Sequence, residues 1–474
     1  MKRSFFLALL ALSLAAFFCT SAVAETKTPA PKKSASPSPK KSGKPTKTPK
    51  ETDPQDDIVR AEPYPIDYVP QCQWGDVLRP LMEPTIKFIG LDIPVKIVDA
   101  TIELTLEGAA VPLKYENKPL FADVKVGDKV FKLGITKTEP GWKYFNATLL
   151  RVRMNQFKIF GYDPDCDGDY FRPAKDGIIY PGSKCVLPFT GEKIWNEGFM
   201  VEFLNTPDGY QINDEEVKAP KDEKEGWNLI NWLRVKAGLH PLELDAQLSG
   251  ACRAHAGYIN QNGGNAIGTP YVEEMGKPGY TPEGAKIASS SFSYYFANMA
   301  DAVKVVTCSF YYRPFFVRGR TKRIGIGFAE PIAVFNTSLN DSQPIEYRYP
   351  IKFPGPEQIV PYTVFNDSAA TVLPDPRPGA QGCGFPASLT FDWGEVSAIS
   401  EGKMWIVDKD GSEKPIQVQV SAPNKPASPQ APDNYGIMAV MPLEQLKNKA
   451  RYHVYIKYSV DGKEAVADWF FETE

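Results

Sequence analysis

Residues 227–242 of this 474-residue chain read WNLINWLRVKAGLHPL, and this stretch decides the fold of the middle of the chain. Its apolar residues Trp227, Ile230 and Leu233 recur at the spacing that places them on one face of a helix. Gly238 follows, and glycine readily adopts the left-handed conformation with which helices commonly end. The stretch therefore predicts an amphipathic helix that ends near residue 238.

Two further segments extend this pattern. Asp245 can cap a second helix, because its side chain accepts a hydrogen bond from a free amide of the first turn. One stripe of that helix carries Leu248, Cys252, His255 and Ile259. Much later, residues 323–329 read RIGIGFA and alternate as a strand does. Its glycines leave one face flat, so we expect another element to pack closely there.

Taken in order, these segments resemble a known family. Residues 228–242 and 245–256 resemble the two helices that open bacterial CAP domains, the family of cysteine-rich secretory proteins, antigen 5 and pathogenesis-related proteins. RIGIG at 323–327 resembles the family's late strand, and YTPEGA at 280–285 resembles the central segment of a CAP subgroup found in secreted multidomain proteins. The resemblance covers residues 222–347 and implies an α/β/α sandwich.

The resemblance also implies a polar cleft, which this chain has altered. Family members usually carry two histidines and two glutamates there, sometimes with a divalent metal, because imidazoles and carboxylates suit zinc-like cations. By spacing, the two histidine positions fall on Tyr271 and Tyr312, and a phenol with a pKa of about 10 is a poor neutral ligand. Glu273, Glu274 and Glu283 remain as candidates for the acidic pair. We expect a binding cleft of these five residues without the family's metal site.

The first 24 residues have the layout of a secretory signal peptide. Lys2 and Arg3 precede an uncharged, largely apolar run at 5–18, and residues 22–24 form a small-x-small cleavage site. We expect a secreted chain, extracellular or periplasmic, with no transmembrane span once the signal is removed. An uncleaved anchor, or a lipoprotein attached at Cys19, is the alternative.

Composition divides the rest of the chain. Residues 25–60 are rich in lysine and proline and lack apolar periodicity, which predicts a disordered tether. Beyond the tether, short strands and Asp-Gly turns alternate near both ends of the chain. We predict an α+β multidomain protein with a β-rich domain at 61–220, a central CAP-type domain at 222–347, a Pro/Gly-rich linker at 348–384, and a C-terminal immunoglobulin-like β-sandwich at 385–474.

The numbers of cysteines and histidines bear on disulfide formation and on the kind of catalysis that the chain can support. Even numbers of cysteines in an exported chain predict disulfides, and we expect the pairs Cys166–Cys185 and Cys252–Cys308 among the six that follow the signal. The pairing itself is not fixed by sequence. Histidine is scarce, which argues against histidine-based catalysis, and His255 is interpreted as a buried structural residue. The three histidines are His240, His255 and His453.

The sequence DPDCDGD at 163–169 is a candidate metal loop. Its carboxylates occupy alternate positions with a glycine at the sixth, an arrangement that suits calcium. It departs from an EF-hand, because the twelfth position is Ala174. A solvated Asp-rich turn is the alternative, and no other cofactor is expected. The candidate ligands are Asp163, Asp165, Asp167, Asp169 and Asp176.

The remaining motifs point away from several functions. Net charge is -3, and no basic helix interleaved with aromatic residues is found, so we expect no nucleic-acid partner. GxSxG, HExxH and Walker patterns are also missing. We predict a cell-surface protein that binds a ligand, a wall polymer or another cell-envelope component without catalysis. The alternatives are a carboxylate-based hydrolase using Glu273, Glu274 or Glu283, and a purely structural surface protein.

Overall fold

The computed structural model describes most of residues 59–474. The gaps are 75, 83, 139–140, 155–156, 207–208, 264–270, 338–349, 366–382, 392–396 and 428–435. The predicted signal peptide and almost all of the predicted tether lie outside the described residues. Within the described part, no helix has both the length and the apolar character needed to cross a membrane.

Residues 60–216 fold into strands, as the alternating apolar pattern predicts. The sheet orders are β1-β11-β12-β13-β14-β2, β3-β10-β9-β8, β4-β5-β6-β7 and β15-β16-β17. The strands are β1 (Arg60–Pro65), β2 (Gln71–Cys72), β3 (Arg79–Pro80), β4 (Thr85–Phe88), β5 (Leu91–Val98), β6 (Thr101–Leu106), β7 (Ala109–Lys114), β8 (Leu120–Val126), β9 (Lys129–Thr138), β10 (Gly141–Asn146), β11 (Thr148–Met154), β12 (Phe157–Tyr162), β13 (Gly177–Ile179), β14 (Cys185–Pro188), β15 (Ile194–Asn196), β16 (Phe199–Thr206) and β17 (Gly209–Glu216).

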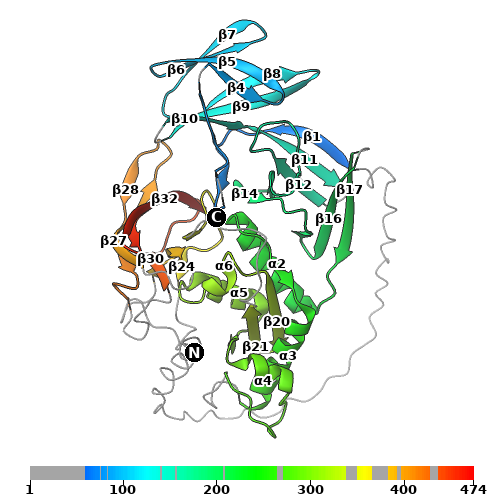
Figure 1. The fold of residues 1–474 in the computed structure, drawn as a ribbon. Coiled ribbons are helices and arrows are strands. Elements are labelled where there is room, and N and C mark those ends of the chain that lie inside the picture. The colour runs from blue at the N-terminus through cyan, green and yellow to red at the C-terminus, as the bar shows by residue number, and fades with distance from the viewer. Residues whose placement is uncertain are drawn as a thin grey trace, which may run out of the picture. The chain divides into compact units, whose positions relative to one another are not determined.

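The middle of the chain holds the helices, which lie beside β20 and β21 in Figure 1. Its sheet has the order β18-β20-β21-β19. The first two helices lie where the sequence predicts them. Gly238 follows α2 at φ +75°, and Asp245 caps α3 by accepting a 2.8 Å hydrogen bond from the amide of Leu248. The elements are α2 (Lys221–Lys236), β18 (Glu243–Leu244), α3 (Ala246–Gln261), α4 (Pro282–Ala288), β19 (Phe292–Tyr295), α5 (Met299–Cys308), α6 (Pro314–Val317), β20 (Arg323–Ala329) and β21 (Ile332–Thr337).

Strand β20 is covered by helices on both faces. A side chain at Gly327 would overlap the backbone of α3 at Cys252 and Arg253, so only glycine allows α3 to approach this closely. On the other face, Ile326 is fully buried and lies in one apolar core with Trp227 of α2. The alternation of glycine and isoleucine thus fixes which helix packs on which face.

The C-terminal strands form two larger sheets, ordered β22-β26-β30-β29 and β23-β32-β31-β27-β28, and the two-stranded sheet β24-β25. Residues 350–365, placed by sequence in a linker, contribute β22, β23 and β24, because Ile351 and Phe353 are fully buried against β26 and its neighbours. The strands are β22 (Ile351–Phe353), β23 (Ile359–Val360), β24 (Val364–Phe365), β25 (Cys383–Gly384), β26 (Ala387–Thr390), β27 (Ser397–Val407), β28 (Glu413–Pro415), β29 (Val418–Ser421), β30 (Ile437–Pro442), β31 (Arg451–Val460) and β32 (Lys463–Thr473).

The expected disulfides are not formed in this structure. In the described part of the chain, Cys166, Cys185, Cys252 and Cys308 form no disulfide. The expected partners lie apart: Cys166 belongs to the apolar core of the β3–β10 region, while the Cys185 thiol donates to the carbonyl of Pro356, 3.1 Å away. Likewise Cys252 and Cys308 belong to separate apolar cores. Sequence spacing alone did not reveal these separations.

Candidate functional site

The first candidate site centres on a buried pair of His255 and Glu273. His255 projects from α3, and its Nδ1 lies 2.9 Å from Oε1 of Glu273. Both side chains are fully buried. The second carboxylate oxygen, Oε2, accepts a 3.0 Å hydrogen bond from the amide of Thr281. The sequence interpretation of His255 as buried is confirmed, but its Nδ1 partner is a carboxylate rather than the backbone.

The loop before α4 is built around this carboxylate. The hydroxyl of Thr281 caps α4 by accepting a 2.9 Å hydrogen bond from the amide of Gly284. A side chain at Gly284 would overlap Oε1 of Glu273, so the first turn of α4 packs directly on the pair. The hydroxyl of Tyr258 in α3 accepts a 2.9 Å hydrogen bond from the amide of Glu274. These contacts hold residues 273–284 against α3.

The other candidate cleft residues have different surroundings. Glu274 is exposed and forms a 2.9 Å ion pair with Lys277. Glu283 is exposed in the first turn of α4, where a negative charge stabilises the helix N-terminus. Tyr271 is partly buried, and the ring of Tyr312 lies 4.6 Å from that of Phe292, centroid to centroid. Of the three glutamates, therefore, only Glu273 is enclosed, and it faces α3.

The remaining two histidines contact residues of the β-rich regions. Burial lowers the pKa of His240 to about 4, and its Nε2 lies 3.1 Å from the carbonyl of Pro188. This contact joins the turn after α2 to β14. His453 in β31 lies between two carboxylates, 3.0 Å from Glu413 and 2.7 Å from Asp468.

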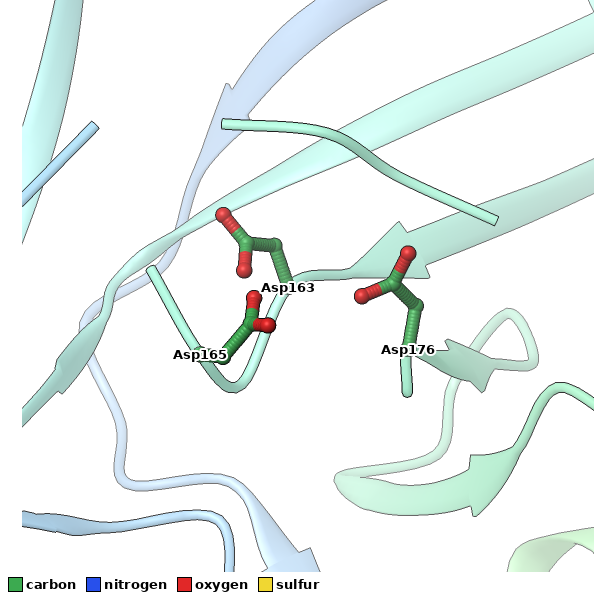
Figure 2. Close-up of side chains that lie close together, drawn as sticks. All are labelled: Asp163, Asp165 and Asp176. Atoms are coloured by element: carbon green, nitrogen blue, oxygen red, sulfur yellow. The ribbon is translucent and has the colours of Figure 1, made fainter. Parts of the chain in front are cut away.

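The second candidate site is the Asp-rich loop. Figure 2 shows Asp163 and Asp165 on one loop, with Asp176 approaching from a separate segment. Carboxylate oxygens of these three residues lie within 4.8 Å of one another. Asp163 and Asp176 are fully buried, and Asp163 accepts a 2.9 Å hydrogen bond from the amide of Gly168. The structure thus gathers three of the five predicted calcium ligands.

Sequence reasoning missed the cation already present at this cluster, Arg172. Its Nη2 lies 2.8 Å from Asp165 and 3.1 Å from Asp176, and its Nη1 pairs with Asp167. Asp169 lies further away, at 3.9 Å. A basic residue three positions after Asp169 was the signal in the sequence. The guanidinium gives these carboxylates a positive partner without a metal ion, and calcium binding stays a prediction.

The pKa values of Asp163 and Asp165 in this cluster are shifted in opposite directions. Burial, together with the hydrogen bond to Asp165, raises the pKa of Asp163 to about 8. Burial alone would raise the pKa of Asp165 too, but the hydrogen bond from Asp163 and the charge of Arg172 hold it below its ordinary value. Two carboxylates this close cannot both ionise at little cost, so one proton resides on Asp163 at neutral pH.

Asp163→Asn is expected to remove a pH dependence of stability. The folded pKa of Asp163, about 8, exceeds the unfolded value of about 3.9, so the folded chain binds the extra proton between these values. Wild-type stability is therefore lost as pH rises through that interval, whereas the amide cannot titrate. Urea unfolding in EDTA should show the stability of the variant, relative to that of wild type, rising by on the order of 4 kcal/mol between pH 5 and 8.5.

The matched control for this titration is Asp169→Asn, whose side chain is 77% exposed. Its stability difference from wild type should stay constant over the same pH range. A constant difference for Asp163→Asn as well would show that Asp163 is ionised throughout.

Comparison with known protein families gives a match to the middle region of the chain. The model of the cysteine-rich secretory protein family, CAP, matches residues 227–331. An extracellular protein containing an SCP domain from Bacillus anthracis str. Ames is similar in structure at 11% identity and TM-score 0.20, over 55% of this chain and 87% of that one. A cysteine-rich secretory protein from Staphylococcus aureus subsp. aureus Mu50 is similar in structure at 11% identity and TM-score 0.18, over 57% of this chain and 98% of that one. No curated protein sequence matches. By the family match, this chain carries a CAP domain of the cysteine-rich secretory protein family at residues 227–331.

Proposed function

We propose that this chain is an exported CAP-domain protein that binds a component of the cell envelope and catalyses no reaction on it. The CAP match at 227–331 supports the first part. The observation that carries the second is the burial of Glu273, whose two oxygens are engaged by His255 and by the amide of Thr281. Because the Glu273 side chain is also fully buried, it is shielded from a metal ion or a substrate that approaches from solvent.

The residues at the two histidine positions support the same proposal. Tyr271 and Tyr312 carry phenols, which are protonated near neutral pH and offer no neutral nitrogen to a metal. A carboxylate-based hydrolase, the enzymatic alternative, needs two carboxyl groups facing one another across the bond to be cleaved. Here Glu273 faces α3, and Glu274 is paired with Lys277.

The finer parts of the proposal concern place and partner. Export, to an extracellular or periplasmic location, rests on the basic and apolar layout of residues 1–24. The two C-terminal sheets support an immunoglobulin-like sandwich as a second module beside the CAP domain. Tyrosine gives a binding surface both stacking area and a polar tip, which suits a wall polymer. A purely structural surface protein remains the second candidate.

Peptidoglycan sedimentation tests this function. The chain from Glu25 onward is incubated with purified sacculi, pelleted, and quantified, and the supernatant is analysed for soluble fragments by mass spectrometry. We expect saturable pelleting with no fragments released. Tyr271→Ala should weaken pelleting about fivefold, because tyrosines commonly dominate binding surfaces.

Tyr64→Ala is the matched control, since Tyr64 is also a partly exposed tyrosine, at 38%, but lies in β1. It should pellet like wild type. Release of soluble fragments would overturn the non-catalytic part of the proposal. An absence of pelleting would overturn the choice of peptidoglycan as the envelope component and favour the structural candidate.

A further inference from the structure

Arg313 is a buried charge that no sequence motif singled out. It lies between α5 and α6 and is fully buried. Among the described residues, no carboxylate pairs with it. Burial lowers its pKa to about 9, so the guanidinium still carries its charge at neutral pH. A charge removed from water at this cost persists only where its donors are satisfied in another way.

Its hydrogen bonds reach into two regions of the chain. On its own side, Nε donates to the carbonyl of Thr307 at 2.8 Å. On the other side, Nη1 donates to the carbonyl of Pro386 at 2.9 Å and to the hydroxyl of Ser388 at 2.8 Å. Both acceptors belong to the C-terminal sheets, where β26 begins. One side chain therefore bonds the CAP domain and the C-terminal region simultaneously.

Two aromatic rings complete the enclosure. The guanidinium carbon lies 4.9 Å from the ring centroid of Phe353 and 4.8 Å from that of Phe385. Both rings come from the C-terminal region. Arginine suits such a site because its planar guanidinium stacks on aromatic rings while its five donors point outward in fixed directions. Lysine, a compact and strongly hydrated charge, does not reproduce this geometry.

Neighbouring contacts join the same two regions. The side-chain Nε2 of Gln358 donates to the carbonyl of Leu233 in α2, at 3.3 Å. A side chain at Gly355 would lie 2.6 Å from Cα of Ala237, so the backbones themselves are in contact. These contacts limit sliding between the regions, and Arg313 limits their separation.

We infer that Arg313 holds together a rigid joint between the CAP domain and the C-terminal β region. Through this joint, the C-terminal region fixes the position of the segment that carries Tyr312. Tyr312 directly precedes Arg313 and packs its ring on Phe292 of β19. This side of the candidate cleft is thus held between the CAP sheet and the C-terminal sheets. The coupling holds whether or not the cleft binds a ligand.

Hydrogen exchange of the full chain, read by mass spectrometry, tests the joint. Ser388→Ala removes one acceptor on the C-terminal side only. We expect about tenfold faster exchange across the joint, in residues 308–317, because a hydrogen bond to a charged group is lost. Arg313→Met should accelerate exchange in both 308–317 and 385–390 by more than this.

Thr390→Val is the matched control, because Thr390 lies on the same strand and its buried hydroxyl has no hydrogen-bond partner among the described residues. It should leave residues 308–317 unchanged. If Arg313→Met fails to fold, Ser388→Ala decides by itself. Faster exchange confined to 385–390 in that variant would overturn the joint, because the effect would then stop at the boundary between the regions.

Discussion

His255→Ala is expected to lower the free energy of unfolding by about 2–4 kcal/mol, because it removes one hydrogen-bond partner of the buried Glu273 carboxyl group and opens a cavity. The substitution leaves Glu273 fully buried with the amide of Thr281 but without its partner on α3. It also leaves a cavity the size of an imidazole beneath α4. Both effects act on the loop that carries Tyr271, so the loss extends to the candidate cleft.

Chemical unfolding followed by tryptophan fluorescence measures this loss. Glu273→Gln keeps the shape of the side chain and replaces its carboxyl group by an amide, so it should cost less, about 1–2 kcal/mol. Glu274→Gln, at the exposed neighbouring position, should stay within about 0.5 kcal/mol of wild type. A His255→Ala variant as stable as Glu274→Gln would show that the pair does not hold the loop.

Arg172→Gln is expected to cost about 2–4 kcal/mol, because Asp176 is fully buried and loses its positive partner. Because Asp163 is protonated, the negative charges that then repel each other without a cation between them are those of Asp165 and Asp176. A divalent cation would relieve this repulsion, and the oxygen-rich loop suits calcium. We therefore expect calcium to restore about 2.7 kcal/mol to the variant at a concentration one hundred times its Kd.

Thermal unfolding with and without calcium separates the two interpretations of the loop. Wild type should respond weakly, since Arg172 already pairs with Asp165 and Asp176. Asp165→Ala added to Arg172→Gln should abolish the rescue. A variant that does not respond to calcium would identify the loop as a solvated turn. An equal response in wild type would show that arginine and metal bind together.

Local patterns account for the parts of the fold that the sequence predicts well. The first helix needs only the spacing of Trp227, Ile230 and Leu233, and the second needs its cap at Asp245. The close approach of α3 follows from glycines in β20. Each of these signals lies within a few residues of the structure that it specifies, so chain topology is not required to interpret it.

Contacts between distant segments account for what the sequence could not predict. His255 and Glu273 are separated by 18 residues, and only the docking of α4 on α3 brings them together. Arg313 finds its acceptors 73 and 75 residues away. The Pro/Gly-rich composition of residues 348–384 suggested a linker, but β22, β23 and β24 form by pairing with the distant strands β26, β32 and β25. In each case tertiary packing outweighs local preference.

Calorimetric titration of the full chain with zinc at neutral pH tests most directly whether the family's metal site is lost. Glu273 is engaged by His255 and Thr281, and the predicted histidine positions hold Tyr271 and Tyr312. Of the three candidate glutamates, this leaves the exposed Glu274 and Glu283. The predicted result is weak binding of the kind that surface carboxylates give, without a stoichiometric end point. Tight binding of one zinc per chain, weakened by Glu283→Gln, would contradict it.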